Sequence, residues 1–565
     1  MHRGPLHSDK ALALLLLVGY GWLFVFFERL NNPNELVRVY MARAIVEQHT
    51  YAIGRRVAQG GGRFADTGPI YSNWGYVNDK AIVCDDPRAK PPSCAGTLYA
   101  VKAPATTLLG LPVVAIMRAL WSRPPTRTEY VFALRWLVII LPTVLLWLCV
   151  RRFLRAAGAG EPAALAVALA GAFGSLSLTY GQLYAGHNLA AVALGFAFMA
   201  AFWPRESPGV EHPASGTLSG PSLRPSLGSP LGLSGDAFVV GLGTALALCA
   251  EYPAGPASLL LGLGWIAARR PGPRAVLYAA LGAAGPLLLL AHFQHAAFGS
   301  IFATPYAHQE NEQFVRDLAK GPLGISMPDG ERLFGSLFSP FLGLFYWAPW
   351  TILIFFAAFR LRRSLPGLTA CAVVAYYLVF QITHAFWRSG WVVGPRYITP
   401  MIPLLALAVG LAFATLRPLA RPLALGVLGG LGAAAVSATG LASAVCQGFP
   451  EDVFNPLREI VGPLLAHGYI PRNPLQLLGV PGLWSAIPYF AALALAIALL
   501  LTAPLRLDPK LPARRLGAFV GVALAASIVL IQWTAMSEPP HAGAVRYLAS
   551  IWEPNPPPGA TPFSK

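Results

Sequence analysis

The chain has 565 residues, of which 55% are hydrophobic and 12% charged, and its mean hydropathy is +0.54. This composition excludes a water-soluble globular protein of this size and indicates a membrane-embedded chain. The net charge of +17 does not indicate a nucleic-acid partner, because the arginines fall in short clusters between apolar runs.

Apolar runs with the length of a membrane-crossing helix recur along the chain. Backbone groups in lipid must bond within their own segment, so we expect an all-α polytopic membrane protein rather than a barrel. Length and hydropathy predict about thirteen transmembrane helices. We place them at residues 11–27, 130–150, 163–181, 188–203, 237–250, 254–268, 275–292, 341–358, 366–383, 398–416, 423–446, 482–503 and 516–535.

The positive charges predict the orientation of these helices. Clusters such as Arg151-Arg152 and Arg269-Arg270 mark cytoplasmic loops. The first apolar run follows Lys10 and lacks a cleavage site, which indicates a retained anchor with a cytoplasmic N-terminus. Residues 103–120 must then lie in the outer interface, since a crossing there would put the later clusters outside. We therefore expect a multi-pass protein of the inner (plasma) membrane.

The spacing of the apolar runs predicts one membrane domain over residues 1–535, followed by a Pro-rich outer tail at 536–565. A large first periplasmic loop, residues 28–129, is expected to carry juxtamembrane helices, and a second outer loop covers 292–340. Residues 204–236 are rich in Pro, Ser and Gly and predict a disordered cytoplasmic linker.

Two cysteines, Cys84 and Cys94, lie in the first outer loop. An oxidising compartment would allow them to form a disulfide, which we favour. A metal pair is the alternative, although the spacing does not fit a zinc knuckle and no pair of histidines accompanies it.

The loop opens with a polar stretch that begins at Asn34 and Glu35. Asn34 suits a helix N-cap and Glu35 suits the first turn, so a capping role is one interpretation. Arg38 is expected on the same helix face as Glu35. A carboxylate held ionised by a guanidinium suits the acceptance of a proton from an acceptor hydroxyl, or the binding of a cation.

The same loop ends with Tyr99-Ala-Val-Lys102-Ala-Pro104, where the chain meets the membrane. A lysine at this level ordinarily extends its ammonium to the interface. Pro104 would begin a helix and direct Lys102 at the headgroup layer, where an ammonium suits the phosphate of a lipid carrier. Asp79 and Lys80 form a second polar pair, or else a surface ion pair.

Polar groups also recur at the predicted outer ends of later helices, where ionisable residues are functional candidates. Glu251 interrupts a long apolar stretch, although Pro253 also fits a plain hairpin turn. Arg388 and Arg396 lie beside aromatic residues, so interfacial anchoring competes with phosphate binding. The groups are Tyr184, Gly186-His187-Asn188, Glu251-Tyr252-Pro253, Trp387-Arg388 and Gly394-Pro395-Arg396-Tyr397.

The order of these motifs resembles bacterial members of the C-type glycosyltransferase superfamily, which are related to aminoarabinose transferase and the protein O-mannosyltransferases. The resemblance covers most of the chain. It implies a polyprenyl-phosphate sugar donor, a periplasmic active site and inversion at the anomeric carbon. It also implies that Glu35 is the base and that Lys102 binds the donor phosphate. Tyr99, Arg388, Arg396 and Tyr397 are the other phosphate-binding candidates.

The chain departs from this pattern at one point. Aminoarabinose-transferase-like members carry a further acid where this chain has Gly186-His187-Asn188. Either His187 or Glu251 substitutes for it, or the metal and base arrangement differs. Asp79, His187, Asn188, Glu251 and Tyr252 are therefore accessory candidates, no cofactor is assigned, and a divalent metal stays an alternative.

The expected partners are the lipid-linked sugar, the bilayer, and a glycan, lipid or protein acceptor. A transporter or flippase of lipid-linked saccharides is the alternative function. It would place ionisable groups near the middle of the membrane and show inverted repeats, and the sequence shows neither.

Overall fold

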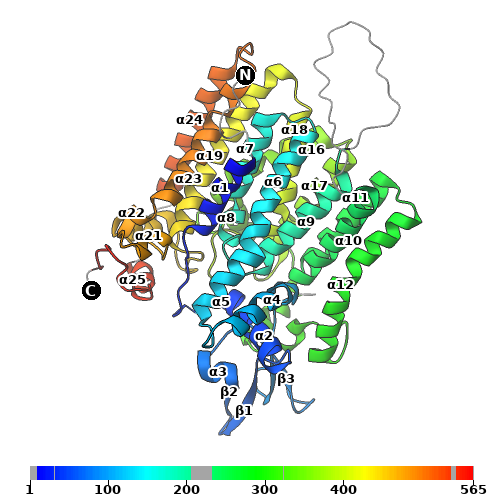
Figure 1. The fold of residues 1–565 in the computed structure, drawn as a ribbon, viewed down its shortest axis with the longest axis vertical. Helices are drawn as coiled ribbons and strands as arrows, with labels where there is room; N and C mark the ends of the chain where they lie inside the picture. The colour runs from blue at the N-terminus through cyan, green and yellow to red at the C-terminus, as the bar shows by residue number, and fades with distance from the viewer. Residues whose placement is uncertain (1–8, 31, 205–231, 322–323, 536–541, 564–565) are drawn as a thin grey trace.

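A computed structural model describes residues 9–30, 32–204, 232–321, 324–535 and 542–563. Most of these residues form helices that run lengthwise as a bundle, and a small β-sheet lies at one end of the bundle (Figure 1). The larger helices are α1 (Asp9–Gly21), α6 (Leu141–Ala156), α7 (Glu161–Phe173), α9 (Gly186–Phe202), α10 (Gly232–Ala250), α11 (Ala254–Arg269), α12 (Pro273–Phe298), α17 (Leu365–Thr383), α18 (Ile402–Ala414), α19 (Arg421–Val445), α23 (Ile487–Leu501) and α24 (Arg514–Thr534).

Among the described residues, six helical segments are long and apolar enough to cross a membrane, which is the pattern of a multi-pass membrane protein. All six coincide with predicted transmembrane helices. The other predicted helices correspond to shorter or interrupted helices, such as α1, α7 and α23, so the count of thirteen stays a prediction. The six segments are Arg127–Ala156, Pro273–Phe298, Leu365–Thr383, Arg396–Ala414, Pro418–Val445 and Arg514–Thr534.

Small residues allow α19 and α24 to pack closely. A Cβ at Gly426 of α19 would lie only 2.1 Å from the carbonyl oxygen of Gly517 in α24. Gly430 faces Gly521 one turn further along, where a Cβ would lie 2.5 Å from that residue's carbonyl oxygen. Close approach of glycine-lined helices is a common way of packing helices in lipid, where the hydrophobic effect does not drive them together.

The expectation of an all-α chain is wrong for the first outer loop. Strands β1 (Gly54–Gly60), β2 (Arg63–Thr67), β3 (Lys80–Cys84) and β4 (Gly96–Ala100) form an antiparallel four-stranded sheet in the order β2-β1-β4-β3. Strands β1 and β2 are short and rich in polar residues, and β3 and β4 have only 5 residues each, so hydropathy alone does not mark these segments as strands. A disulfide joins Cys84 to Cys94 with a Cα–Cα distance of 5.7 Å and closes the connection between β3 and β4.

The helices of the first outer loop lie at the same end of the bundle as the sheet (Figure 1). They are α2 (Pro33–Gln48), α3 (Pro69–Trp74), α4 (Ala105–Leu120) and α5 (Arg127–Leu134). Helix α4 covers the segment predicted not to cross the membrane, and it packs against α2 and α5. Its exposed face carries apolar side chains such as Ile116 and Leu120, as an interfacial helix would.

Two other predicted segments differ from their expectation. Most of the linker predicted at 204–236 lies outside the described residues, but residues 232–236 already belong to helix α10. The described part of the C-terminal segment, residues 542–563, packs against other parts of the chain. Its helix α25 (Ala542–Ser550) contacts the helical segment at residues 457–466, and Trp552 is buried against Phe27 and Tyr469.

The predicted second outer loop contains the short helices η3 (Pro305–His308), α13 (Glu312–Leu318) and α14 (Gly330–Leu337). The loop joins the sheet beside β3, because the backbone N–H of Glu310 donates to the carbonyl oxygen of Lys80 at 3.0 Å. Residues Ala81 and Gln309 also form an isolated β-bridge. The two outer loops therefore form one unit.

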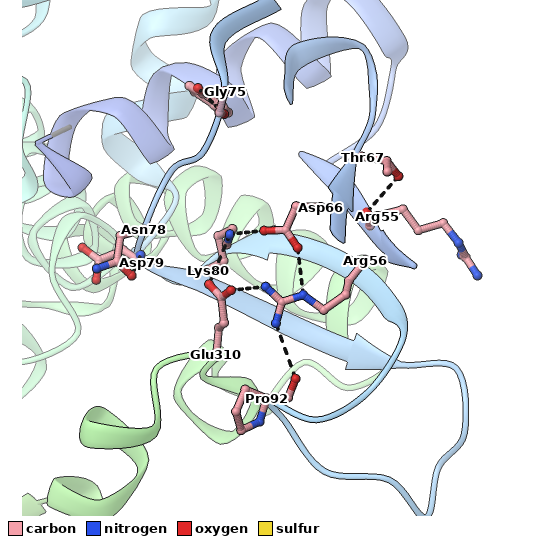
Figure 2. Close-up of polar contacts among 11 residues, drawn as sticks. Arg55, Arg56, Asp66, Thr67, Gly75, Asn78, Asp79, Lys80, Pro92 and Glu310 are labelled. Atoms are coloured by element: carbon pink, nitrogen blue, oxygen red, sulfur yellow. Dashed lines mark hydrogen bonds and ion pairs between the residues drawn. The ribbon is translucent and has the colours of Figure 1, made fainter. Parts of the chain in front are cut away.

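Four charged side chains, Arg56, Asp66, Lys80 and Glu310, lie together where these loops meet, and we call them the outer charge cluster (Figure 2). Arg56 Nε donates to Asp66 Oδ1 at 2.8 Å, and Lys80 contacts both carboxylates. Burial alone would raise the pKa of Asp66, but hydrogen bonds from Arg56 and Lys80 outweigh it and lower the pKa below its ordinary value. The cluster is balanced, with two positive and two negative groups.

We expect Glu310→Ala to destabilise the unit formed by the two outer loops by roughly 3 kcal/mol, because it leaves a buried positive charge uncompensated. The measurement is hydrogen exchange of the backbone amides in β3 and η3 of the full-length protein, which becomes faster when the two loops separate more often. Glu312→Ala is the matched control, since Glu312 is 65% exposed and, among the described residues, forms an ion pair with Arg316 alone. Equal protection of the wild type and the Glu310 variant would contradict a structural role for the cluster.

Candidate functional site

A cavity of about 330 Å³ lies at the start of α2 and is lined by charged and amide side chains from distant parts of the chain. One wall is apolar, with Phe26, Phe27 and Leu30 following the first helix. The polar side chains of the lining include Glu35, Asp79, Arg135, Arg396 and Gln447.

Helix α2 positions Glu35 in its first turn. Pro33 occupies the first position of the helix, and the side chain of Asn32 accepts a hydrogen bond from the backbone N–H of Asn34. The N-cap is therefore Asn32 and not the predicted Asn34. Glu35 keeps the predicted place in the first turn, where a carboxylate suits the helix dipole.

The partner of Glu35 is Arg135 and not Arg38. Arg135 Nε and Nη2 donate to the two carboxylate oxygens of Glu35 at 2.7 and 2.6 Å. The backbone N–H of Tyr184 donates a third hydrogen bond, to Glu35 Oε1 at 2.7 Å. Glu35 is fully buried and the side chain of Arg135 is 4% exposed, so this is a bidentate ion pair shielded from water.

Arg135 was not among the predicted site residues. It is the one charged residue in the apolar run from Val131 to Val150 of the sequence. The search for charged residues within apolar stretches, which identified Glu251, would have found it. It begins η2 (Arg135–Ile140), a π-helical segment between α5 and α6. Such segments occur frequently at functional sites.

Arg38 belongs to a second group, with Glu251 and His187. Arg38 Nη2 lies 3.2 Å from Glu251 Oε1, and His187 Nδ1 lies 3.6 Å from the same oxygen. Burial raises the pKa of Glu251 above its ordinary value, although Arg38, Lys102 and Arg396 act to lower it. The structure thus brings together five of the predicted residues, Arg38, Lys102, His187, Glu251 and Arg396.

Gly186 makes this approach possible because it has no side chain. A Cβ at Gly186 would lie 2.2 Å from the carbonyl oxygen of Ala250 and 2.3 Å from Glu251 Oε1. Any larger residue would push the Glu251 carboxylate away from Arg38.

Asp79 and Lys102 connect the group of Arg38, His187 and Glu251 with the cavity. Lys102 Nζ lies 3.0 Å from Asp79 Oδ2, and the two side chains are 18% and 5% exposed. The predicted pairing of Asp79 with Lys80 is wrong. Asp79 has a φ of 61° and faces the cavity, whereas Lys80 begins β3 and belongs to the outer charge cluster.

Arg396 lines the cavity without a carboxylate partner within ion-pair distance in the described part of the chain. Its Nε is buried and has no hydrogen-bond partner. Its guanidinium carbon lies 5.3 Å from the ring centroid of Tyr397, and that ring packs against His187 and His384. Arg396 is therefore a positive group that faces the cavity and is available to an anion.

The other predicted candidates lie elsewhere. Tyr99 packs against Phe298, and Tyr252 packs against Tyr306. Arg388 is half-exposed and pairs with Glu331 at 3.0 Å. Asn188 is buried inside the bundle, where it donates to Thr143 Oγ1 at 2.6 Å. None of the four lines the cavity. Among the described residues, no group of three His, Cys, Asp or Glu side chains could hold a metal ion.

No family model and no curated protein matches the chain. Solved structures do match it. Apo ArnT (aminoarabinose transferase) from Cupriavidus metallidurans is 15% identical with a TM-score of 0.41, over 94% of this chain and 75% of that chain. ArnT bound to undecaprenyl phosphate gives 15% identity and a TM-score of 0.45, over 94% and 77%. Arabinosyltransferase EmbB from Mycobacterium smegmatis gives 14% and 0.41, over 95% and 41%. These similarities assign no role to any residue of this chain.

We expect Gly186→Ala to lower the Tm of the purified protein, because the new methyl group overlaps the Ala250 carbonyl and the Glu251 carboxylate. Overpacking of this kind costs about 1–3 kcal/mol. Gly262→Ala in α11 is the matched control: a Cβ there meets open space, and alanine favours a helix. Thermal unfolding of both variants in the same detergent measures the difference, and equal Tm values would contradict the tight packing of Gly186.

Proposed function

We propose that the chain is a membrane glycosyltransferase, which transfers a sugar from a polyprenyl-phosphate donor to an acceptor at the outer face of the inner membrane, with inversion. The observation that carries the proposal is the guanidinium of Arg396, which has no carboxylate partner among the described residues, in a cavity that also contains Asp79, the partner of Lys102. Such a cavity offers positive charge to a phosphate and a carboxylate to an acceptor hydroxyl.

The positive groups suit a phosphate leaving group. Among the described residues, Arg396 has no carboxylate within ion-pair distance, and Lys102 forms an ion pair with Asp79 alone. A phosphate that gains charge as the bond to the sugar breaks is stabilised by cations already in place. The apolar wall at Phe26, Phe27 and Leu30 would face the first part of a polyprenyl chain.

The proposed reaction is one displacement at the anomeric carbon. The acceptor hydroxyl oxygen forms the new bond to that carbon, the bond from the carbon to the phosphate oxygen breaks, and its electron pair remains on the phosphate. The hydroxyl proton moves to a carboxylate. A single displacement inverts the anomeric configuration.

Asp79 is the carboxylate that we assign as the base. The resemblance implied Glu35, but both oxygens of Glu35 accept hydrogen bonds from Arg135, and no part of its side chain is exposed. Asp79 lines the cavity and pairs only with Lys102 among the described residues. Glu35 then acts as a positioning residue that holds Arg135 in the cavity wall.

We expect Asp79→Asn to lower the turnover of sugar transfer by about 10²–10⁴-fold while the protein remains folded. Glu35→Gln should instead lower stability by about 3–5 kcal/mol, because it leaves Arg135 buried with an uncharged partner. The assay is transfer by the full-length protein in vesicles supplied with lipid extract from a strain that lacks it. A stable, inactive Glu35→Gln protein beside an active Asp79→Asn protein would return the base role to Glu35. Movement of intact lipid-linked sugar without transfer would indicate a flippase.

The two arginines of the predicted phosphate site should behave differently. Arg396→Gln should raise the KM for the lipid-linked donor about tenfold or more, as expected when a charged hydrogen bond to a phosphate is lost. Arg388→Gln is the matched control, because Arg388 pairs with Glu331 at the surface. Donor titrations in the same vesicles measure both values. Equal KM values for the two variants would remove Arg396 from the phosphate site.

A further inference from the structure

A second hollow, of about 470 Å³, adjoins the cavity and shares Trp391 with it. We call it the outer groove. Its walls are Trp391, the segment Pro450-Glu451-Asp452, and Tyr547 of helix α25. No step of the proposed reaction uses these residues.

Two neighbouring loops connect the groove with the cavity. The loop at 389–391 lines the cavity through Ser389 and the groove through Trp391. The loop at 446–452 lines the cavity through Gln447 and the groove through Glu451. The two loops are held together, because the backbone N–H of Phe449 donates to the carbonyl oxygen of Val392 at 3.1 Å. A molecule bound in the groove is therefore held at a set position relative to the cavity.

The groove combines aromatic rings with carboxylates. Trp391 and Tyr547 are 37% and 48% exposed, and their rings meet edge to face with centroids 6.0 Å apart. Glu451 and Asp452 are exposed, and neither forms an ion pair or side-chain hydrogen bond with any described residue. Carboxylates at neutral pH accept hydrogen bonds only, and exposed aromatic rings offer apolar faces.

This chemistry fits a saccharide. The C–H face of a pyranose or furanose ring packs on an aromatic ring, and its hydroxyls donate hydrogen bonds to carboxylates. A phosphorylated headgroup fits poorly, because the described residues that line the groove include two carboxylates and no Lys, Arg or His, so the lining would repel it. An acyl chain would leave both carboxylates desolvated without a donor.

We propose that the outer groove is the acceptor subsite and that the acceptor is a glycan chain, one hydroxyl of which reaches the cavity past Trp391. The proposal rests on the proposed function, and it gives helix α25 a role in the site. The end of the chain, which the sequence predicted as a Pro-rich tail, supplies one wall of the subsite.

The test combines the purified full-length protein with two cell fractions, both prepared from a strain that lacks this protein. The organic lipid extract supplies the lipid-linked sugar, and the delipidated envelope residue supplies the glycans. Sugar incorporation is measured against the concentration of envelope residue, and hydrolysis of the lipid-linked sugar is measured in its absence. The variants are Tyr547→Ala, Tyr547→Phe and the double variant Glu451→Gln, Asp452→Asn. Trp484→Ala is the control, because Trp484 is 71% exposed and lies on α22 (Gly482–Ser485), outside both hollows.

Tyr547→Ala and the double variant should raise the half-saturating concentration of envelope residue about tenfold, with the maximal rate and the acceptor-independent hydrolysis unchanged. Tyr547→Phe, which keeps the ring face, should resemble the wild type. Unchanged half-saturation in Tyr547→Ala, an equal loss of hydrolysis, or sugar transfer into the lipid fraction alone would overturn the inference. If the wild type leaves the lipid-linked sugar intact, the proposed function itself fails, which is a separate result.

Discussion

The buried ion pair of Glu35 and Arg135 is the interaction on which the site depends. It joins the first turn of α2 to the π-helical segment η2, and the backbone N–H of Tyr184 adds a third element to the same carboxylate. Two charges removed from water carry a large desolvation cost, which only a bidentate geometry with further hydrogen bonds offsets. Moving Glu35 away from Arg135 would leave two buried charges without partners. Helix α2 is therefore fixed in position against the bundle. Arg38 on the next turn then reaches Glu251.

The β-sheet also helps to position the cavity lining, through the consecutive residues Asp79 and Lys80. Lys80 lies in the outer charge cluster, which joins the sheet to the second outer loop, while Asp79 faces the cavity and holds Lys102. The backbone of Asp79 adopts a positive φ, an arrangement that Asn and Asp tolerate better than most residues. The cluster therefore determines where a cavity carboxylate lies, although none of its four members lines the cavity.

Charge balance distinguishes the structural groups from the group that can bind a ligand. The pair of Glu35 and Arg135 is buried and has no net charge, and the same holds for the outer charge cluster. Because their charges already neutralise each other, these groups have no free charge with which to bind a ligand. Around Asp79, Glu251, Arg38, Lys102 and Arg396 the three cations exceed the two carboxylates, and Arg396 has no ion-pair partner in the described part of the chain. An anion is the natural complement of that excess. The outer groove has the opposite excess, of carboxylates, so the two hollows favour different ligands.

Hydropathy was enough to predict the membrane class and all six long apolar helices, because these depend on local composition. The pairing of Cys84 with Cys94 was also within reach, since the two residues are close in the chain. Only the tertiary structure decided which charges meet. Arg38 lies three residues from Glu35 yet bonds Glu251, Glu35 bonds Arg135, and Trp391 meets Tyr547 across the outer groove. These partners are more than 90 residues apart, and their contact depends on how helices pack, which no local pattern of residues encodes.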